Sequence, residues 1–130
     1  MSRLILCFLV LLIGLPWTGR ANIQPDFNVI NGRPKVKIEA GPESATKYNL
    51  DDSKQLEYTL SLVREGNEIR WKTRENKPMI HTASGIYDYF INPTGSGYVK
   101  VLKSDEGCEY LEHLNLHFGT INYYGECDVR

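Results

Sequence analysis

Apolar residues recur at every second position in several stretches of this chain, and turn-forming residues separate those stretches. In residues 56–62, leucine or tyrosine alternates with polar residues, and the alternation resumes in residues 69–73 after a Glu-Gly-Asn turn at 65–67. Successive side chains of a strand point to opposite faces, so this period indicates strands with one dry and one wet face. Two such runs around a glycine-containing turn predict a β-hairpin.

The same pattern extends through the rest of the chain. We expect strands at 35–39, 86–91, 98–103, 109–118 and 120–124, and at most one helical turn in the Gly- and Pro-containing stretch 40–53. Residues 109–118 are expected to turn Leu114, Leu116 and Phe118 towards the interior. Six to seven short strands at about ten-residue spacing predict an all-β fold, a small antiparallel β-sandwich or barrel.

The N-terminus has the features of a secretory signal peptide. One basic residue, Arg3, precedes an apolar run from Leu4 to Leu15, and small residues follow at Gly19 and Ala21. This arrangement predicts cleavage after Ala21, which removes residues 1–21. We expect an irregular N-terminal arm at 22–34 and a single β-domain at 35–130, a length that suits one domain.

Only two cysteines remain after that cleavage, Cys108 and Cys127. Exported chains enter an oxidising space where such a pair forms a disulfide, so we predict a secreted or periplasmic protein. The bridge would close a loop of about 20 residues, which contributes about 3 kcal/mol in the chain-entropy model. The wide spacing favours a structural bond over a redox-active pair.

Charge and hydropathy argue against nucleic-acid and membrane partners. Removal of residues 1–21 takes away two of the 15 basic residues and none of the 16 acidic ones, which leaves 13 against 16 and a net charge of −3. This weakly acidic balance predicts no nucleic-acid binding. No second run reaches the roughly 18 apolar residues that a membrane span requires.

Few residues carry a recognisable catalytic pattern. His113 and His117 could share a zinc ion on a helix, but a strand separates them by about 13 Å at about 3.3 Å per residue. His81 has no identifiable partner in the sequence, and phosphate-loop, dinucleotide and nucleophile-elbow motifs are lacking. The sequence therefore predicts no metal and no cofactor, and it favours a role other than catalysis.

Tyrosines are the more informative residues. Tyr87 and Tyr89 lie on one face of their expected strand, and Tyr98 begins the strand that follows. Tyrosine offers a large apolar area, a polar tip and few rotatable bonds, which suits binding faces. Arg70 and Lys72 lie on one face of a neighbouring expected strand and could complement an acidic partner. The alternative is that the rings are ordinary cross-strand packing and the cations a solvated face.

Three functions are compatible with these observations. The first is an exported binding protein that acts on another exported protein as an inhibitor, immunity-type partner or accessory factor. The second is a lipocalin-like carrier of a small apolar ligand, which predicts a cavity lined by residues such as Leu60, Leu62, Trp71 and Phe90. The third is a small secreted hydrolase that uses His81 or His113 with a nearby acid.

Overall fold

The computed structural model describes residues 22–23 and 26–130, and the expected signal peptide at 1–21 lies outside these described residues. Within them the chain is antiparallel β-sheet apart from one short helix, α2 (Asp52–Glu57). The strands are β1 (Val29–Ala40), β2 (Ala45–Asn49), β3 (Leu60–Glu65), β4 (Glu68–Trp71), β5 (Lys77–Ser84), β6 (Tyr87–Ile91), β7 (Gly97–Ser104), β8 (Gly107–Asn115) and β9 (Thr120–Val129).

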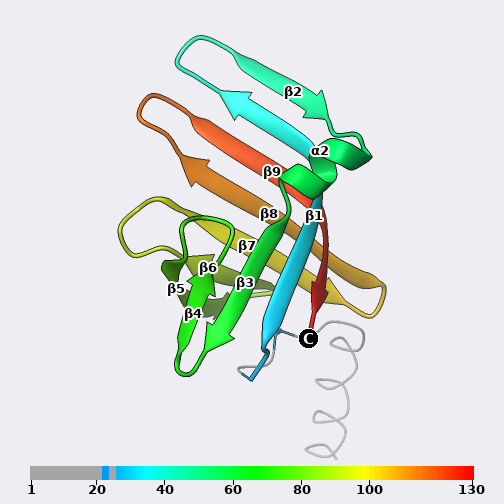
Figure 1. Cartoon of the computed structure of the whole chain (residues 1–130), viewed down its shortest axis with the longest axis vertical. Coiled ribbons are helices and arrows are strands. Elements are labelled where there is room, and N and C mark those ends of the chain that lie inside the picture. Colours follow the sequence, from blue (N-terminus) through cyan, green and yellow to red (C-terminus); the bar gives the residue numbers. More distant parts are fainter. Residues whose placement is uncertain (1–21, 24–25) are drawn as a thin grey trace, which may run out of the picture.

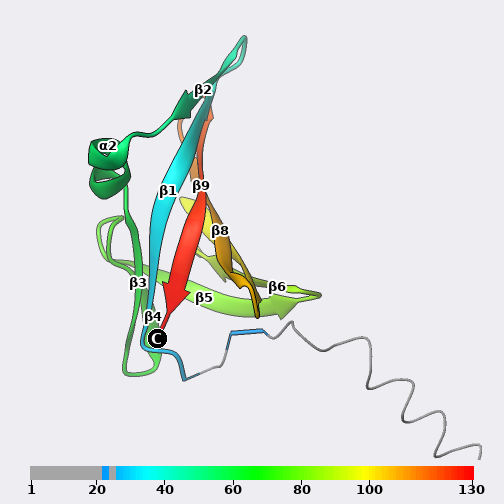
Figure 2. The same cartoon turned by 90° about the vertical axis from the view of Figure 1, so that its right-hand side faces the viewer.

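Strand β1 closes the sheet into a barrel. Its first residues, Val29–Gly32, pair with β3, whereas its whole length from Ile30 to Ala40 pairs with β9. In the described part of the chain eight strands therefore form a closed barrel, and β2 adds a ninth beside the second half of β1. Figures 1 and 2 show this second half as a wing of β2, β1, β9 and β8 that extends beyond the barrel.

The expected all-β antiparallel class is confirmed, and the closure between β1 and β9 makes the fold a barrel. The expected number of six to seven strands is too low, since the described residues hold nine. Strand β2 was missed because all five of its residues are exposed, so the sequence carries no alternation of wet and dry positions there. Strand β5, which includes His81, was not among the expected strands because Pro78 interrupts its pattern.

The alternation at residues 56–58 belongs to a helix end and not to a strand. Asp51 caps α2, because its Oδ1 accepts a hydrogen bond of 2.9 Å from the backbone N–H of Lys54. An aspartate at this position satisfies a free N–H of the first helical turn. Leu56 consequently lies on the exposed side of α2, 64% accessible, and the strand begins only at Leu60.

Three other expectations about element bounds are wrong. Strand β1 begins at Val29, inside the expected irregular arm of 22–34. Strand β8 ends at Asn115, so Leu116 and Phe118 lie in the following turn, 53% and 75% exposed, and not in the interior. Strand β9 continues to Val129, which places Cys127 within it.

A filled hydrophobic core occupies the barrel. Leu60, Leu62, Trp71 and Phe90 are each at most 1% exposed. Ile23 and Phe27, which precede β1, are also buried in this core, with the Phe27 ring edge-on to Phe90 at 5.5 Å. The expected disulfide is present between Cys108 of β8 and Cys127 of β9, which is consistent with an oxidising compartment.

Candidate binding surface

The outer face of β6 to β9 carries a band of aromatic and aliphatic side chains. Directly paired residues on neighbouring strands share a face, and the register aligns Tyr89, Lys100, Leu111 and Tyr124 in one row across the four strands. The residues that alternate with them, such as Phe90 and Val101, are buried in the barrel. We call the outer set the tyrosine face: Tyr87, Tyr89, Tyr98, Lys100, Leu111 and Tyr124.

Contacts between neighbouring rings order this face. Tyr89 lies between Tyr87 and Tyr98, with 6.4 Å between ring centroids in each pair. The Lys100 ammonium lies 3.9 Å from the centre of the Tyr87 ring, a cation–π contact. The Tyr98 ring stacks on His113 at 4.8 Å. Because these rings remain partly exposed, with Tyr124 39% accessible, they present apolar area and hydroxyl groups to solvent.

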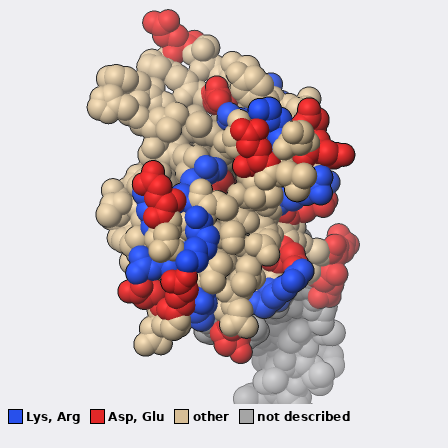
Figure 3. All heavy atoms as spheres, viewed as in Figure 1, with Lys and Arg blue, Asp and Glu red and all other residues tan. Residues whose placement is uncertain are grey.

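The structure brings Tyr87 and Tyr89, which were expected on one face of their strand, together with Tyr98, but Arg70 and Lys72 are not part of the same face. Arg70 lies on β4 and forms an ion pair with Glu68, and Lys72 follows β4 and pairs with Glu65. Strand β5 separates β4 from β6. Figure 3 shows acidic and basic side chains intermixed over the region of β3 and β4, so these cations lie on a locally neutralised surface.

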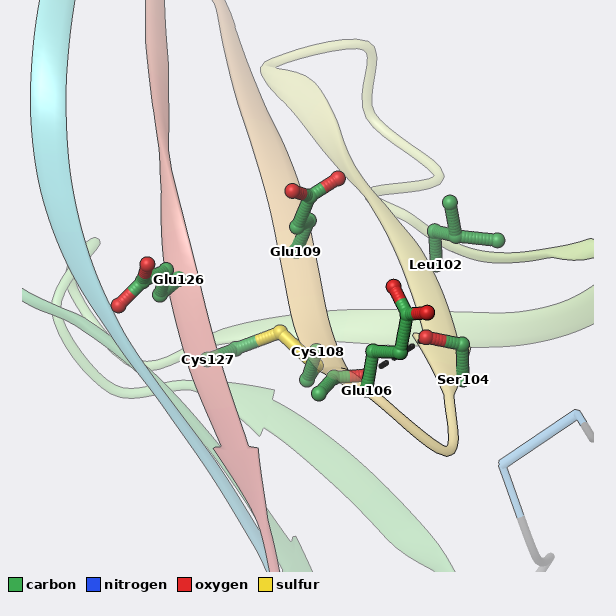
Figure 4. Close-up of a pocket in the computed structure, with 8 residues that line it drawn as sticks. Leu102, Ser104, Glu106, Cys108, Glu109, Glu126 and Cys127 are labelled. Atoms are coloured by element: carbon green, nitrogen blue, oxygen red, sulfur yellow. Dashed lines mark hydrogen bonds between the residues drawn. A yellow bond between two sulfur atoms is a disulfide. The ribbon is translucent and has the colours of Figure 1, made fainter. Parts of the chain in front are cut away.

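Two grooves follow the tyrosine face. The first, of about 240 Å³, is lined mainly by Tyr87, Lys100, Leu102, Glu109, Leu111 and Tyr124. The second, of about 450 Å³, contains Leu102 and Glu109 as well, together with Ser104, Glu106, Glu126 and the disulfide. Figure 4 shows the second groove, where carboxylates of β8, β9 and the β7–β8 turn surround the disulfide. The two shared residues place the grooves side by side.

The inner face of the same strands holds a buried ion pair. The Glu112 carboxylate is fully buried and accepts hydrogen bonds from Trp71 Nε1 at 2.7 Å and from Arg74 Nε and Nη2 at 3.2 and 2.9 Å. Arg74 therefore turns into the molecule. Burial alone would lower the pKa of Arg74, but the hydrogen bond and negative charge of Glu112 raise it above its ordinary value.

Two tyrosines lie beside this ion pair. Burial raises the pKa of Tyr110 well above its ordinary range, and the Glu112 charge adds to that rise. Burial also raises the pKa of Tyr123, although the cations Lys37 and Arg74 oppose it. Lys37 lies 4.7 Å from the centre of the Tyr58 ring and donates to Glu39 at 2.8 Å. The cluster is thus a network of charged and aromatic side chains around Glu112 and Tyr123.

A second buried carboxylate, Asp88, belongs to β6. Asp88 is 1% exposed, pairs through Oδ1 with His81 Nε2 at 2.7 Å, and accepts the backbone N–H of Ile23 on Oδ2 at 2.8 Å. The His81 ring stacks on Phe90 at 4.6 Å. Among the described residues no serine, threonine or cysteine side chain hydrogen-bonds to His81, so this His–Asp pair is not part of an assembled nucleophile triad.

The other histidines have packing partners. His113 lies on β8 and its two ring nitrogens contact Asn122 at 2.7 Å and Asn115 at 2.9 Å. His117 lies in the β8–β9 turn, edge-on to Phe118. Within residues 22–23 and 26–130, no group of three His, Cys, Asp or Glu side chains is arranged to hold a metal ion. The helix of that region is too short and too polar to cross a membrane.

Comparison with other proteins gives no assignment. The chain matches no protein-family model, no curated protein and no solved structure. The fold itself defines the class: a disulfide-linked antiparallel β-barrel whose β1 strand also carries the additional strand β2.

Several residues of this surface were not singled out from the sequence. Lys100 and Leu102 follow Tyr98 at two-residue spacing, so their common face was readable. Leu111, Glu109 and Tyr124 were missed because their position beside the tyrosines depends on the β7–β8 and β8–β9 registers. Glu112 and Arg74 lie 38 residues apart, and no local pattern links them.

Proposed function

We propose that this protein is exported and binds another exported protein through the tyrosine face, as an inhibitor, immunity-type partner or accessory factor. The observation that carries the proposal is the row of partly exposed side chains formed by Tyr89, Lys100, Leu111 and Tyr124 across four adjacent strands. The signal-peptide pattern of residues 1–21 and the Cys108–Cys127 bond support export.

Rigid aromatic side chains suit such a role for a physical reason. Tyrosine buries a large area on binding while losing little side-chain entropy, and its hydroxyl retains a hydrogen-bonding tip. Here the sheet already fixes the rings, since Tyr89 packs between Tyr87 and Tyr98. A partner therefore meets a preorganised surface, which lowers the cost of association.

The test is affinity capture from periplasmic or culture extract with wild-type protein and two variants. Tyr89→Ser combined with Tyr98→Ser changes the tyrosine face, and Tyr48→Ser removes an exposed tyrosine of β2 as the control. Wild type and the control should retain a stoichiometric partner that the double variant loses. Equal capture by all three proteins, or no stoichiometric partner from repeated extracts, would refute the proposal.

A lipocalin-like carrier is the second candidate, favoured by the closed barrel of eight strands in the described residues. Against it stands the packing of Leu60, Leu62, Trp71 and Phe90, the expected cavity lining, into one buried cluster. Native mass spectrometry of freshly purified protein separates the two candidates. A retained small molecule would support the carrier, and an unliganded mass together with partner capture would support the binding protein.

A further inference from the structure

Two glutamates face each other directly across strands β8 and β9. Glu109 and Glu126 form a register pair on the outer face, and Glu106 lies in the adjoining β7–β8 turn. Like charges directly opposite each other destabilise a sheet. Lys35 pairs with Glu126 at 3.0 Å, but within the described residues neither Glu109 nor Glu106 forms an ion pair. Lys35 therefore compensates the charge of Glu126 but not that of Glu109, and an exposed charge set opposite a like charge is expected where a function requires it.

The pair continues a row of the tyrosine face. The register places Tyr87 of β6 opposite Leu102 of β7, Leu102 opposite Glu109 of β8, and Glu109 opposite Glu126 of β9. The row therefore begins with an aromatic ring, continues with a leucine and ends in two carboxylates. Figure 4 shows Leu102 on one side of the groove and Glu109 and Glu126 on the other.

We propose that the docking segment of the partner is a basic one: a lysine or arginine next to an aromatic or aliphatic anchor. This inference deepens the proposed function and rests on it. The anchor would pack against Tyr87 and Leu102, and the cation would enter the groove between Glu109 and Glu106. Burial of the anchor and charge complementarity at the carboxylates then act on the same segment.

The strand spacing sets the separation between anchor and cation. Neighbouring strands lie about 4.8 Å apart, so Leu102 is separated by about 5 Å from Glu109 on the next strand and by about 10 Å from Glu126 two strands away. An extended segment advances about 3.3 Å per residue, which places the cation about one to three residues from the anchor. Such a short spacing is a specific prediction about the partner's sequence.

A second copy of this chain fits the groove less well than a basic partner. The chain without residues 1–21 carries a net charge of −3, and its cations Arg70 and Lys72 already pair with Glu68 and Glu65. Within the described residues the carboxylates do not converge into a metal site either. A cationic segment of another protein would give Glu109 an ion partner and leave the Lys35–Glu126 pair in place.

The experiment is a selection of random nine-residue peptides displayed on phage against the purified, disulfide-bonded protein. The enriched peptide is synthesised together with a version in which its lysines and arginines are glutamine. Binding of both is measured by fluorescence anisotropy at low and high salt to wild type, to Tyr87→Ser, to Glu106→Gln/Glu109→Gln and to the control Glu43→Gln/Glu75→Gln. The control removes the same charge at exposed positions outside the groove.

We expect a consensus with a basic residue about one to three positions from an aromatic or aliphatic one. Affinity should fall about tenfold for Glu106→Gln/Glu109→Gln and for the glutamine peptide, and less than about twofold for the control. Unfolding curves should show that the groove variant is no less stable than wild type, because it removes a repulsion, so the weaker binding cannot be attributed to misfolding.

The outcomes separate the two proposals. A consensus without basic residues, no enrichment at all, or equal affinity for the groove variant and the control would overturn the basic-segment inference. If Tyr87→Ser still abolishes binding, the tyrosine face stands as the binding surface. If peptide binding is insensitive to Tyr87→Ser and also to the double variant Tyr89→Ser/Tyr98→Ser, the proposed function fails as well. Binding of the protein to itself in the same assay would assign the groove to a second copy and would also overturn the inference.

Discussion

Two carboxylates are buried on the inner face of the barrel, and their charges are compensated in different ways. Glu112 of β8 contacts the guanidinium of Arg74 and the indole of Trp71. Asp88 of β6 contacts the imidazole of His81 and the backbone N–H of Ile23, which precedes the first strand. Glu112 is therefore paired with a permanently charged guanidinium from the β4–β5 turn, whereas Asp88 is held by His81 of β5 and by a backbone N–H of the N-terminal segment.

The difference separates contacts that stabilise the whole barrel from contacts that hold only the N-terminal segment against it. Removing one partner of a buried ion pair leaves an uncompensated charge, whereas a segment end held by hydrogen bonds can open locally without global unfolding. Ile23 and Phe27 are the described residues that link the N-terminal segment to the core. The Glu112 cluster should thus control global stability, and Asp88 should control how firmly the N-terminal segment is held.

The largest effect should follow from breaking the Glu112 pair. Arg74→Met leaves the Glu112 carboxylate buried with only the Trp71 indole as a donor, which should lower the free energy of unfolding by about 3–5 kcal/mol. The double variant Arg74→Met/Glu112→Met should recover most of that loss, because no unpaired charge remains. Urea unfolding followed by tryptophan fluorescence measures both. Additive losses in the double variant would show that Glu112 and Arg74 are not coupled.

A smaller and more local effect is expected at Asp88. Asp88→Asn keeps an oxygen that can accept the Ile23 N–H but removes the charge, which should cost about 1.5–3 kcal/mol. In Asp88→Asn the amide hydrogen of Ile23 should exchange faster than the amides of the barrel core. In Arg74→Met the exchange of Ile23 should not exceed the rate that global unfolding sets. Unchanged protection of Ile23 in Asp88→Asn would mean that Asp88 does not hold the N-terminal segment.

Alkaline pH should weaken the Glu112 cluster. The folded-state pKa values of Tyr110 and Tyr123 lie above the ordinary value of about 10. The unfolded chain therefore loses these protons first as the pH rises. Their contribution to stability is full below about pH 10 and decreases above it.

Lys37 acts in the same direction, because the Glu39 hydrogen bond and nearby negative charge outweigh the opposing effect of burial and raise its pKa. Urea unfolding between pH 8 and 11 tests the slope, and Tyr110→Phe/Tyr123→Phe should reduce it. A free energy of unfolding that stays constant or rises over this range would contradict the prediction.

The fold could be predicted from the sequence where the cause is local. Strands β6 and β7 follow from alternation around a glycine-containing turn, and the Cys108–Cys127 bond follows from the cysteine count and the leader. Helix α2 was not predicted, because five of its six residues are polar and the remaining one, Leu56, joins the two-residue alternation that continues to Leu62. Closure between β1 and β9 links residues 90 or so positions apart, and no short-range pattern encodes that pairing.

The candidate site likewise has one feature that follows from local sequence and others that depend on how distant strands pair. That Tyr87 and Tyr89 share a face is a consequence of strand parity alone. The arrangement of Tyr87, Leu102 and Glu109 in one row requires three correct registers, because a slip of one residue would move a strand's side chains to the other face. The ion pair of Arg70 with Glu68 was not readable from the sequence for a different reason, because it depends on side-chain geometry.

A modest gain in stability is expected beside Glu112. The Tyr110 hydroxyl is buried and has no hydrogen-bond partner among the described residues, although its ring packs closely against Gly32. Tyr110→Phe keeps the ring and removes the unpaired hydroxyl, so the free energy of unfolding should rise by about 1 kcal/mol. Glu112 would then remain paired as before. A loss of 1 kcal/mol or more would show that the hydroxyl contributes to the cluster.

The smallest effect should come from the outer face of the same strands. Tyr89→Ser removes a partly exposed ring whose neighbours Tyr87 and Tyr98 remain anchored on the sheet, so we expect a loss of about 0.5–1 kcal/mol from the two ring contacts. Partner binding, in contrast, should fall severely, as hot-spot tyrosines do when truncated. Unfolding curves and capture assays on the same preparations compare the two quantities. A loss of stability as large as that of Arg74→Met would mean that the rings of the tyrosine face stabilise the barrel. Their role would then be packing and not partner binding.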